Sequence, residues 1–266
     1  MMRITPAPLP TETEKSLLAL QQSIDALSTY AERVAEANRA FATQNRSDNK
    51  TFQFVRKTLG DACQGAHRCM YCEDSAADQI DHFRPKAFYP NLAFVWLNYL
   101  YSCGRCNLAK QHRFSVCDMS TSVVVPINRR RGEPPIEPPD GHSVLIDPRV
   151  DDPLDYLSLD LHGTFQFLPK HSKGTYEHQR AEYTIEVLKL NAYDWQLSAR
   201  REAYGNYRAR LTEYVNAKGS PKEQVLVQAM MRCAQPTVWA EMKRNAGVIA
   251  ELKILFDAAP EAQTWR

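Results

Sequence analysis

Residues 69–72 read Cys-Met-Tyr-Cys and residues 103–106 read Cys-Gly-Arg-Cys, so the chain carries two CxxC pairs. The CxxC spacing lets two thiolates turn toward one ion, and two such turns complete a tetrahedron with Zn–S bonds of about 2.3 Å. Four soft sulfur ligands that leave no open position are typical of structural zinc rather than catalytic zinc. A single CxxC would also suit a thioredoxin-like redox protein, but the βαβ setting of that motif is absent around these pairs. The predicted zinc ligands are Cys69, Cys72, Cys103 and Cys106.

The overall composition is that of a globular protein. Of 266 residues, 44% are hydrophobic and 24% are charged, which supplies enough apolar material for a core and excludes a fully disordered chain. The odd number of cysteines, seven, argues against a disulfide framework and for metal or thiol chemistry. No apolar run reaches the about 18 residues that a membrane span needs, and the N-terminal residues lack the apolar segment of a signal peptide. We therefore expect a cytoplasmic protein.

The spacing of apolar residues predicts a mostly helical α+β protein. Thr11 and Glu14 fit a capping box, and apolar residues at helical spacing predict one helix from there to about residue 42. Alternation over residues 157–167 predicts a β-hairpin, and helical spacing returns over 175–217 and 222–257. The predicted parts are an N-terminal helical segment (1–50), a cysteine-rich core (51–125), a Pro-rich loop with short strands (126–174) and a C-terminal helical region (175–266).

Polar residues able to perform catalysis lie between and just after the two cysteine pairs. Asp81 and His82 are adjacent, Asn98 follows, and Asn107 comes directly after the second pair. Taken singly, each is an ordinary residue: most histidines beside an aspartate are surface or core residues, and an asparagine often caps a helix. Their order, with all of them in or beside a segment bracketed by cysteines of zinc-site type, is hard to obtain by chance.

From Cys69 to about Phe114 the chain resembles the HNH endonucleases of the ββα-metal fold. It most resembles a subgroup with the pattern CxYC, then DHFRPK, then WxN, then SCxxCNxxK. Those proteins are the HNH partners of an ATPase in Septu-type and related retron-associated anti-phage systems. Looser matches extend to about residue 200 and include residues 145–149. The resemblance implies a ββα-metal core with a four-cysteine zinc knuckle, a role in antiviral defence and an ABC- or SMC-like ATPase partner, for which the helical flanks are candidate docking surfaces.

Transferred residue by residue, the resemblance implies a catalytic site in this chain. His82 would be the general base that takes a proton from the attacking water, and Asp81 and Asn107 would hold one divalent cation. Asn98 would orient the backbone or ring of His82 through hydrogen bonds. Asn107 stands where many HNH proteins have a final histidine. Because an amide oxygen is a hard, weak ligand, this difference favours Mg²⁺ or Mn²⁺ over zinc at the catalytic position.

Basic residues surround the predicted catalytic residues and are candidates for contacts with the phosphates of a nucleic acid. Their alternative role is a solvated surface or structural ion pairs. HNH chemistry attacks the phosphate and needs no 2′-hydroxyl, so DNA is favoured over RNA as the substrate. The predicted nucleic-acid-binding residues are Arg84, Lys86, Arg105, Lys110 and Arg113.

Other functions fit part of the same pattern. A zinc-knuckle adaptor that binds nucleic acid or protein would need the cysteines but not Asp81, His82 or Asn107. An HNH nuclease directed at RNA, such as tRNA, would share the whole site. A CxxC redox protein is the third alternative, and stoichiometric zinc with four unreactive thiols would exclude it.

Overall fold

The computed structural model of the chain describes residues 1–63, 67–130 and 132–265. Helices dominate it and three small sheets join them, so the expected α+β class is confirmed. The helices are α1 (Thr11–Asp25), α2 (Tyr30–Gln44), α3 (Lys50–Ala62), α4 (Gly104–Lys110), α5 (Pro153–Tyr156), α6 (Tyr176–Val187), α7 (Asp194–Ala217), α8 (Glu223–Met231), α9 (Pro236–Arg244) and α10 (Ala250–Ala258), with 3-10 turns η1 (Pro90–Leu92), η2 (Trp96–Asn98) and η3 (Pro260–Thr264). The strands are β1 (Gln79–His82), β2 (Tyr99–Ser102), β3 (Phe114–Asp118), β4 (Val123–Ile127), β5 (His142–Ser143), β6 (Leu157–Leu159) and β7 (Phe167–Pro169).

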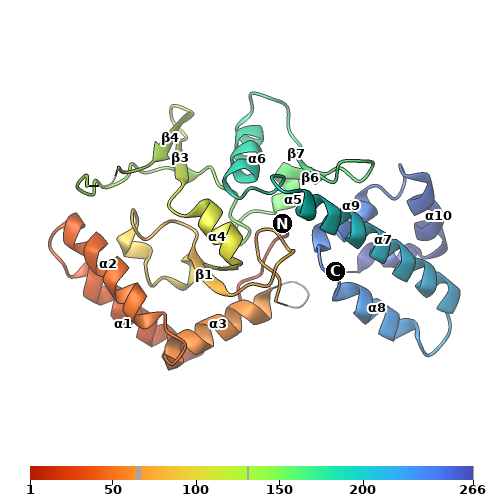
Figure 1. The fold of residues 1–266 in the computed structure, drawn as a ribbon, viewed down its shortest axis with the longest axis horizontal. Helices are drawn as coiled ribbons and strands as arrows, with labels where there is room; N and C mark the ends of the chain where they lie inside the picture. Colours follow the sequence, from red (N-terminus) through yellow and green to blue (C-terminus); the bar gives the residue numbers. More distant parts are fainter. Residues whose placement is uncertain (64–66, 131, 266) are drawn as a thin grey trace.

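A two-stranded sheet and a short helix lie at the centre of the molecule (Figure 1). Strands β1 and β2 pair antiparallel, with Asp81 opposite Leu100 and His82 opposite Tyr99. Helix α4 begins directly after Cys103, which follows β2. The short hairpin followed by a helix, expected around the cysteine pairs, is therefore present.

The N-terminal segment is two helices and not the single helix predicted over residues 11–42. Helix α1 ends at Asp25 and α2 begins at Tyr30. The Thr29 side chain accepts a hydrogen bond from the Glu32 amide while the Glu32 carboxylate accepts one from the Thr29 amide, so a capping box starts α2. The capping box predicted at Thr11 is absent, because Pro10 is the residue that precedes α1. Apolar spacing continues across the break, and for this reason periodicity alone missed it.

Helix α3 was not expected. The Asn49 side chain caps it by accepting a hydrogen bond from the Phe52 amide. Its buried face, formed by Phe52, Val55 and Leu59, belongs to the core, and the helix contacts strand β2. Helices α1, α2 and α3 therefore lie on one side of the central hairpin, as Figure 1 shows.

The C-terminal half largely follows the sequence pattern. Strands β6 and β7 form the predicted antiparallel hairpin. Asn191, between α6 and α7, accepts a hydrogen bond from the Phe167 amide and donates one to the Phe167 carbonyl, so this loop fixes β7. Helices α7 to α10 lie on the opposite side of the hairpin from α1 to α3 (Figure 1).

Residues 147–151, together with Arg180 of α6, form a partly buried polar network. The Arg180 guanidinium of α6 pairs with the Asp151 carboxylate at 2.6 Å. The Asp151 carboxylate also accepts a hydrogen bond from the Asp147 amide, and the Arg149 guanidinium donates one to the Trp96 carbonyl. This network joins α6 to the 145–152 turn and that turn to the segment before β2. The buried core draws on all four predicted parts of the chain, whose boundaries stay a prediction.

None of the helices in the described part of the chain combines the length and the hydropathy that a membrane-spanning helix needs.

Candidate functional site

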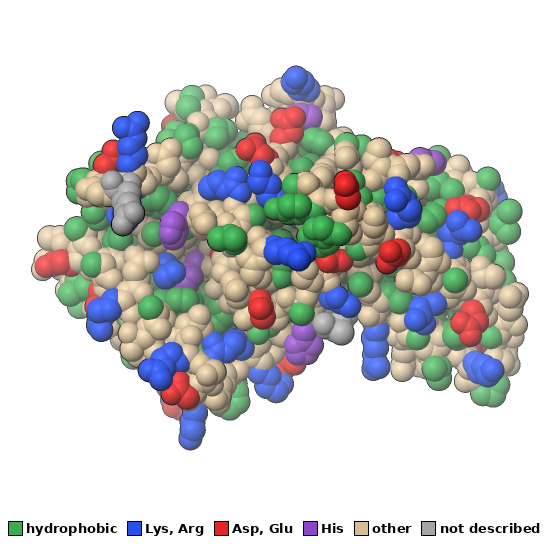
Figure 2. All heavy atoms as spheres, viewed as in Figure 1, with side chains coloured by type: hydrophobic (Ala, Val, Ile, Leu, Met, Phe, Trp, Pro, Cys, Tyr) green, Lys and Arg blue, Asp and Glu red, His purple; other side chains and the backbone are tan. Residues whose placement is uncertain are grey.

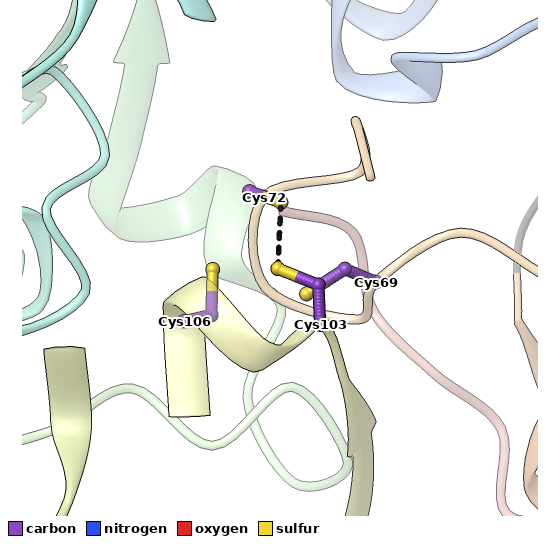
Figure 3. Close-up of side chains that lie close together, drawn as sticks. All are labelled: Cys69, Cys72, Cys103 and Cys106. Carbon is purple, nitrogen blue, oxygen red and sulfur yellow. Dashed lines mark hydrogen bonds between the residues drawn. The ribbon is translucent and has the colours of Figure 1, made fainter. Parts of the chain in front are cut away.

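The four cysteines of the two CxxC pairs converge on one point (Figure 3). Cys69 and Cys72 come from the loop that precedes β1, whereas Cys103 directly precedes α4 and Cys106 lies in its first turn. Their Sγ atoms all lie within 4.8 Å of one another, and the four side chains are buried. The prediction that the two pairs meet is confirmed.

The geometry of this cluster fits a tetrahedral zinc ion. Zn–S bonds of about 2.3 Å place sulfur atoms about 3.8 Å apart in a tetrahedron, and the Sγ atoms of Cys72 and Cys103 are 3.9 Å apart. Hydrogen bonds from Cys106 and Cys69 lower the pKa of the Cys103 thiol, as expected where sulfurs share charge at short range. These four cysteines could bind one zinc ion and would leave it no open coordination position.

Asp81 and Lys110 form a buried ion pair beside the cluster. The Lys110 ammonium lies 3.1 Å from Oδ2 of Asp81 and donates a 2.6 Å hydrogen bond to the His82 carbonyl. Lys110 is fully buried and Asp81 is 4% exposed. The Tyr71 hydroxyl donates a 2.6 Å hydrogen bond to Oδ2 of the same carboxylate. Lys110 therefore holds α4 against β1, which is the structural ion pair named as the alternative to its predicted contact with phosphate.

The His82 imidazole is buried in an aromatic environment. Its ring centroid lies 4.4 Å from that of Phe41 and 5.2 Å from that of Tyr99. Nε2 lies 2.9 Å from the Ala93 carbonyl, which can only accept, so Nε2 carries the hydrogen and Nδ1 keeps its lone pair. Burial, with a smaller contribution from the charge of Lys86, lowers the pKa of His82 well below its usual range. The ring is therefore a neutral imidazole with Nδ1 as its basic atom.

Asn98 closes the loop between β1 and β2. Its Oδ1 accepts a 2.8 Å hydrogen bond from the Arg84 amide, and its Nδ2 donates to the carbonyls of Arg84 and Leu92. Ala93, whose carbonyl holds the His82 ring, directly follows Leu92. Asn98 thus fixes the loop that carries the partner of His82, whereas the sequence predicted a hydrogen bond to His82 itself.

Asn107 faces β1 from helix α4. Its Nδ2 donates a 2.7 Å hydrogen bond to Oε1 of Gln79. Among the described residues, no hydrogen bond to its Oδ1 is present, so this oxygen is a candidate ligand. Asp81, His82 and Asn107 all line one open cavity of about 990 Å³. The structure therefore brings three of the four predicted catalytic residues to one cavity. The fourth, Asn98, fixes the loop that holds the His82 ring.

The walls of this cavity include residues that no sequence motif indicated. Asn45, Ser47 and Arg56 come from the end of α2, the following loop and α3, and His112 follows α4. The Arg56 guanidinium donates a 2.6 Å hydrogen bond to Oδ1 of Asn45. No motif points to the first three, because they lie before the first CxxC pair. His112, six residues after Cys106, is the one that the sequence could have indicated.

The predicted nucleic-acid-binding residues occupy different places. Lys86 lines the cavity, with its ammonium 4.9 Å from the Phe41 ring centroid. Arg84 lines a second cavity of about 530 Å³, which Asn98 also lines. Arg105 stacks over Trp195 at 4.5 Å. Arg113 donates a hydrogen bond to the Val187 carbonyl and so ties the end of α4 to α6.

Charge is mixed over the face that Figure 2 shows. Lys and Arg side chains alternate there with Asp and Glu and with hydrophobic side chains, and no continuous basic surface is visible. This agrees with the formal net charge of +2. A net charge this small gives the chain little overall long-range attraction for a polyanion.

Comparisons with known proteins place the chain near the Septu proteins. It is 29% identical over 133 residues to the Septu protein PtuB of Bacillus thuringiensis, a match that covers 48% of this chain and 38% of the relative. It is 30% identical over 146 residues to the Septu protein PtuB of Bacillus mycoides, a match that covers 46% of each chain. The chain thus matches less than half the length of these relatives. The similarity supports a Septu-related family, and no protein-family model matches the chain.

Proposed function

We propose that this protein is a metal-dependent endonuclease of the HNH class that hydrolyses phosphodiester bonds of nucleic acid. The observation that carries the proposal is the single cavity that Asp81, His82 and Asn107 line, on a hairpin and helix whose ends meet at four cysteines. An adaptor would need the cysteines alone. The three polar residues meet in one cavity, and an adaptor would not require this arrangement.

The donor set in the cavity fits a hard divalent cation. Asp81 supplies a carboxylate and Asn107 an amide Oδ1, which are the oxygen ligands that Mg²⁺ and Mn²⁺ prefer. Lys110 and Tyr71 already contact the Asp81 carboxylate, and a carboxylate offers about four lone-pair positions, so one position stays available. A cation bound there would supply charge neutralisation at the scissile phosphate and the leaving oxygen.

His82 is suited to act as the general base. The Ala93 carbonyl fixes the tautomer that leaves Nδ1 as a proton acceptor, and the packing of Phe41 and Tyr99 fixes the plane of the ring. Nδ1 would take a proton from the attacking water. Asn98 keeps the Ala93 carbonyl in place and is therefore a positioning residue.

DNA is the favoured substrate and RNA the alternative, because attack on the phosphate needs no 2′-hydroxyl. Lys86 and Arg56 line the cavity and could contact the phosphates on either side of the scissile bond. The mixed surface charge agrees with a partner that supplies part of the grip on nucleic acid.

The similarity to PtuB supports a role in anti-phage defence together with an ATPase partner. We expect the chain to co-purify with an ATPase encoded beside it when the two are co-expressed. Full cleavage activity of the isolated chain, with no association between the two proteins, would show that the chain does not act with this partner. The N-terminal helices are a candidate docking surface for this partner. The partner would bind the side of these helices that faces away from the cavity, because the loop between α2 and α3 lines the cavity itself.

The proposed activity is tested with the purified chain, Mg²⁺ or Mn²⁺, and DNA and RNA substrates. We expect divalent-dependent cleavage that Asn107→Ala lowers by about 100-fold or more, since a lost ligand weakens charge stabilisation by several kcal/mol. Asn107 is half-buried and makes one side-chain hydrogen bond, so this change leaves the buried Asp81–Lys110 pair intact. Binding of nucleic acid with no cleavage under any divalent cation would support the adaptor instead.

A further inference from the structure

Tyr71 connects the four-cysteine site to the proposed catalytic site. It lies between Cys69 and Cys72 in the first CxxC pair and is fully buried. Its hydroxyl donates a 2.6 Å hydrogen bond to Oδ2 of Asp81. One side chain of the metal-binding turn therefore contacts the carboxylate that would hold the catalytic cation.

The position of the Tyr71 ring is set by the turn that carries it. The Met70 amide donates a 2.9 Å hydrogen bond to the Tyr101 carbonyl, and the Tyr101 amide donates one to the Met70 sulfur. These bonds join the turn to β2, which pairs with the strand that carries Asp81. These contacts hold the cysteine turn, and with it the Tyr71 ring, in a fixed position relative to the hairpin that carries Asp81.

The Asp81 carboxylate has two contacts of different kinds. The Lys110 ammonium lies 3.2 Å from Oδ1 and 3.1 Å from Oδ2, so it contacts both oxygens almost equally and does not distinguish one from the other. Tyr71 donates to Oδ2 alone and so distinguishes Oδ2 from Oδ1. Without the hydroxyl, the Asp81 carboxylate would keep only its contact with the ammonium, and its two oxygens would be free to exchange places.

We propose that Tyr71 is a positioning residue that orients the Asp81 carboxylate for a divalent cation and so couples the geometry of the four-cysteine site to the catalytic site. The proposal rests on the proposed function, because it takes Asp81 as a ligand of that cation. It assigns to the turn between the cysteines a role beyond holding zinc.

The test is direct binding of Mn²⁺ to the zinc-loaded full chain. Binding is measured from the decrease in the electron paramagnetic resonance signal of free Mn²⁺. Partners that orient a metal ligand typically change metal affinity by about 10- to 100-fold, so we expect Tyr71→Phe to weaken Mn²⁺ binding by that factor. The zinc content, and the absorption spectrum of Co²⁺ at the four cysteines, should match those of the wild type.

Tyr214→Phe is the matched control. The Tyr214 hydroxyl is also a donor to carboxylates, with Glu261 at 2.7 Å and Glu223 at 2.9 Å, but it lies in the C-terminal helical region. Its removal should leave Mn²⁺ affinity unchanged. The control separates the loss of a hydroxyl–carboxylate bond at Asp81 from the loss of such a bond elsewhere.

The outcomes distinguish this inference from the proposed function. One outcome is that the wild type binds Mn²⁺, that Asp81→Asn loses Mn²⁺ binding, and that Tyr71→Phe keeps full affinity. In that case Tyr71 does not position the Asp81 carboxylate, and only this inference fails. If the wild type binds no Mn²⁺, or Asp81→Asn binds it normally, the proposed function fails and this inference fails with it. A Tyr71→Phe chain that unfolds or loses the Co²⁺ spectrum would assign the hydroxyl a structural role and overturn the inference.

Discussion

Replacing His82 with alanine is expected to lower divalent-dependent cleavage by about 1,000-fold, within the range that a general base contributes. The reason is that no other described side chain on the cavity wall presents a neutral imidazole whose basic atom is fixed by a backbone carbonyl, as the Ala93 contact does for His82. The zinc content should not change, because His82 is not part of the four-cysteine cluster. Single-turnover cleavage with saturating enzyme measures the effect on chemistry apart from binding.

His162→Ala is the control for this prediction. His162 is exposed at the turn between β6 and β7, outside the cavity-lining residues. The His162→Ala chain should cleave nucleic acid at the wild-type rate. Because His82 packs on Phe41 and Tyr99, thermal unfolding of His82→Ala must be measured as well, and activity compared at a temperature where both chains are folded. Unchanged cleavage by folded His82→Ala would show that another group is the base.

Loss of one cysteine ligand should have the largest effect on stability. Structural zinc contributes apparent binding free energies of about 10–16 kcal/mol in small domains, and whole domains are stable by only about 5–15 kcal/mol. We expect Cys106→Ser to abolish stoichiometric zinc and to lower the free energy of unfolding by about 5 kcal/mol. At about 2–4 °C per kcal/mol, the melting temperature would fall by about 10 °C or more.

Cys233→Ser is the matched control for the zinc prediction. Cys233 is half-buried, lies outside the four-cysteine cluster and contacts the Ala229 carbonyl. Its replacement should leave the zinc content at one ion per chain. Metal analysis together with scanning calorimetry measures both quantities. A Cys106→Ser chain with unchanged melting temperature would mean that the cysteine cluster does not hold the hairpin and α4 together.

The sequence predicted best the features that depend on short spacing. The CxxC pairs follow from local spacing, whereas the hairpin that carries Asp81 and His82 and the helix that begins near Cys103 follow from the resemblance, and the structure contains all three. Metal-ligand spacing is a strong constraint because two thiolates on one turn have few other arrangements. Local pattern therefore located the candidate site, although the roles of its residues stay predictions.

Features that depend on tertiary contact could not be predicted in the same way. The break between α1 and α2 depends on a capping box at Thr29, which apolar periodicity does not register. Lys110 was predicted to contact phosphate, and its burial in an ion pair depends on Asp81 from a different element. Arg56 reaches the cavity only because α3 packs beside β2. Contacts between distant segments have no signature in the local pattern of one sequence.

The most direct test is a crystal structure of the zinc-loaded chain grown with Mn²⁺, with anomalous diffraction recorded at the zinc and manganese absorption edges. The account predicts a zinc peak among Cys69, Cys72, Cys103 and Cys106 and a separate manganese peak bound by Asp81 and Asn107 on the wall of the large cavity. A manganese peak elsewhere, or none at saturating Mn²⁺ while the zinc peak is present, would contradict it.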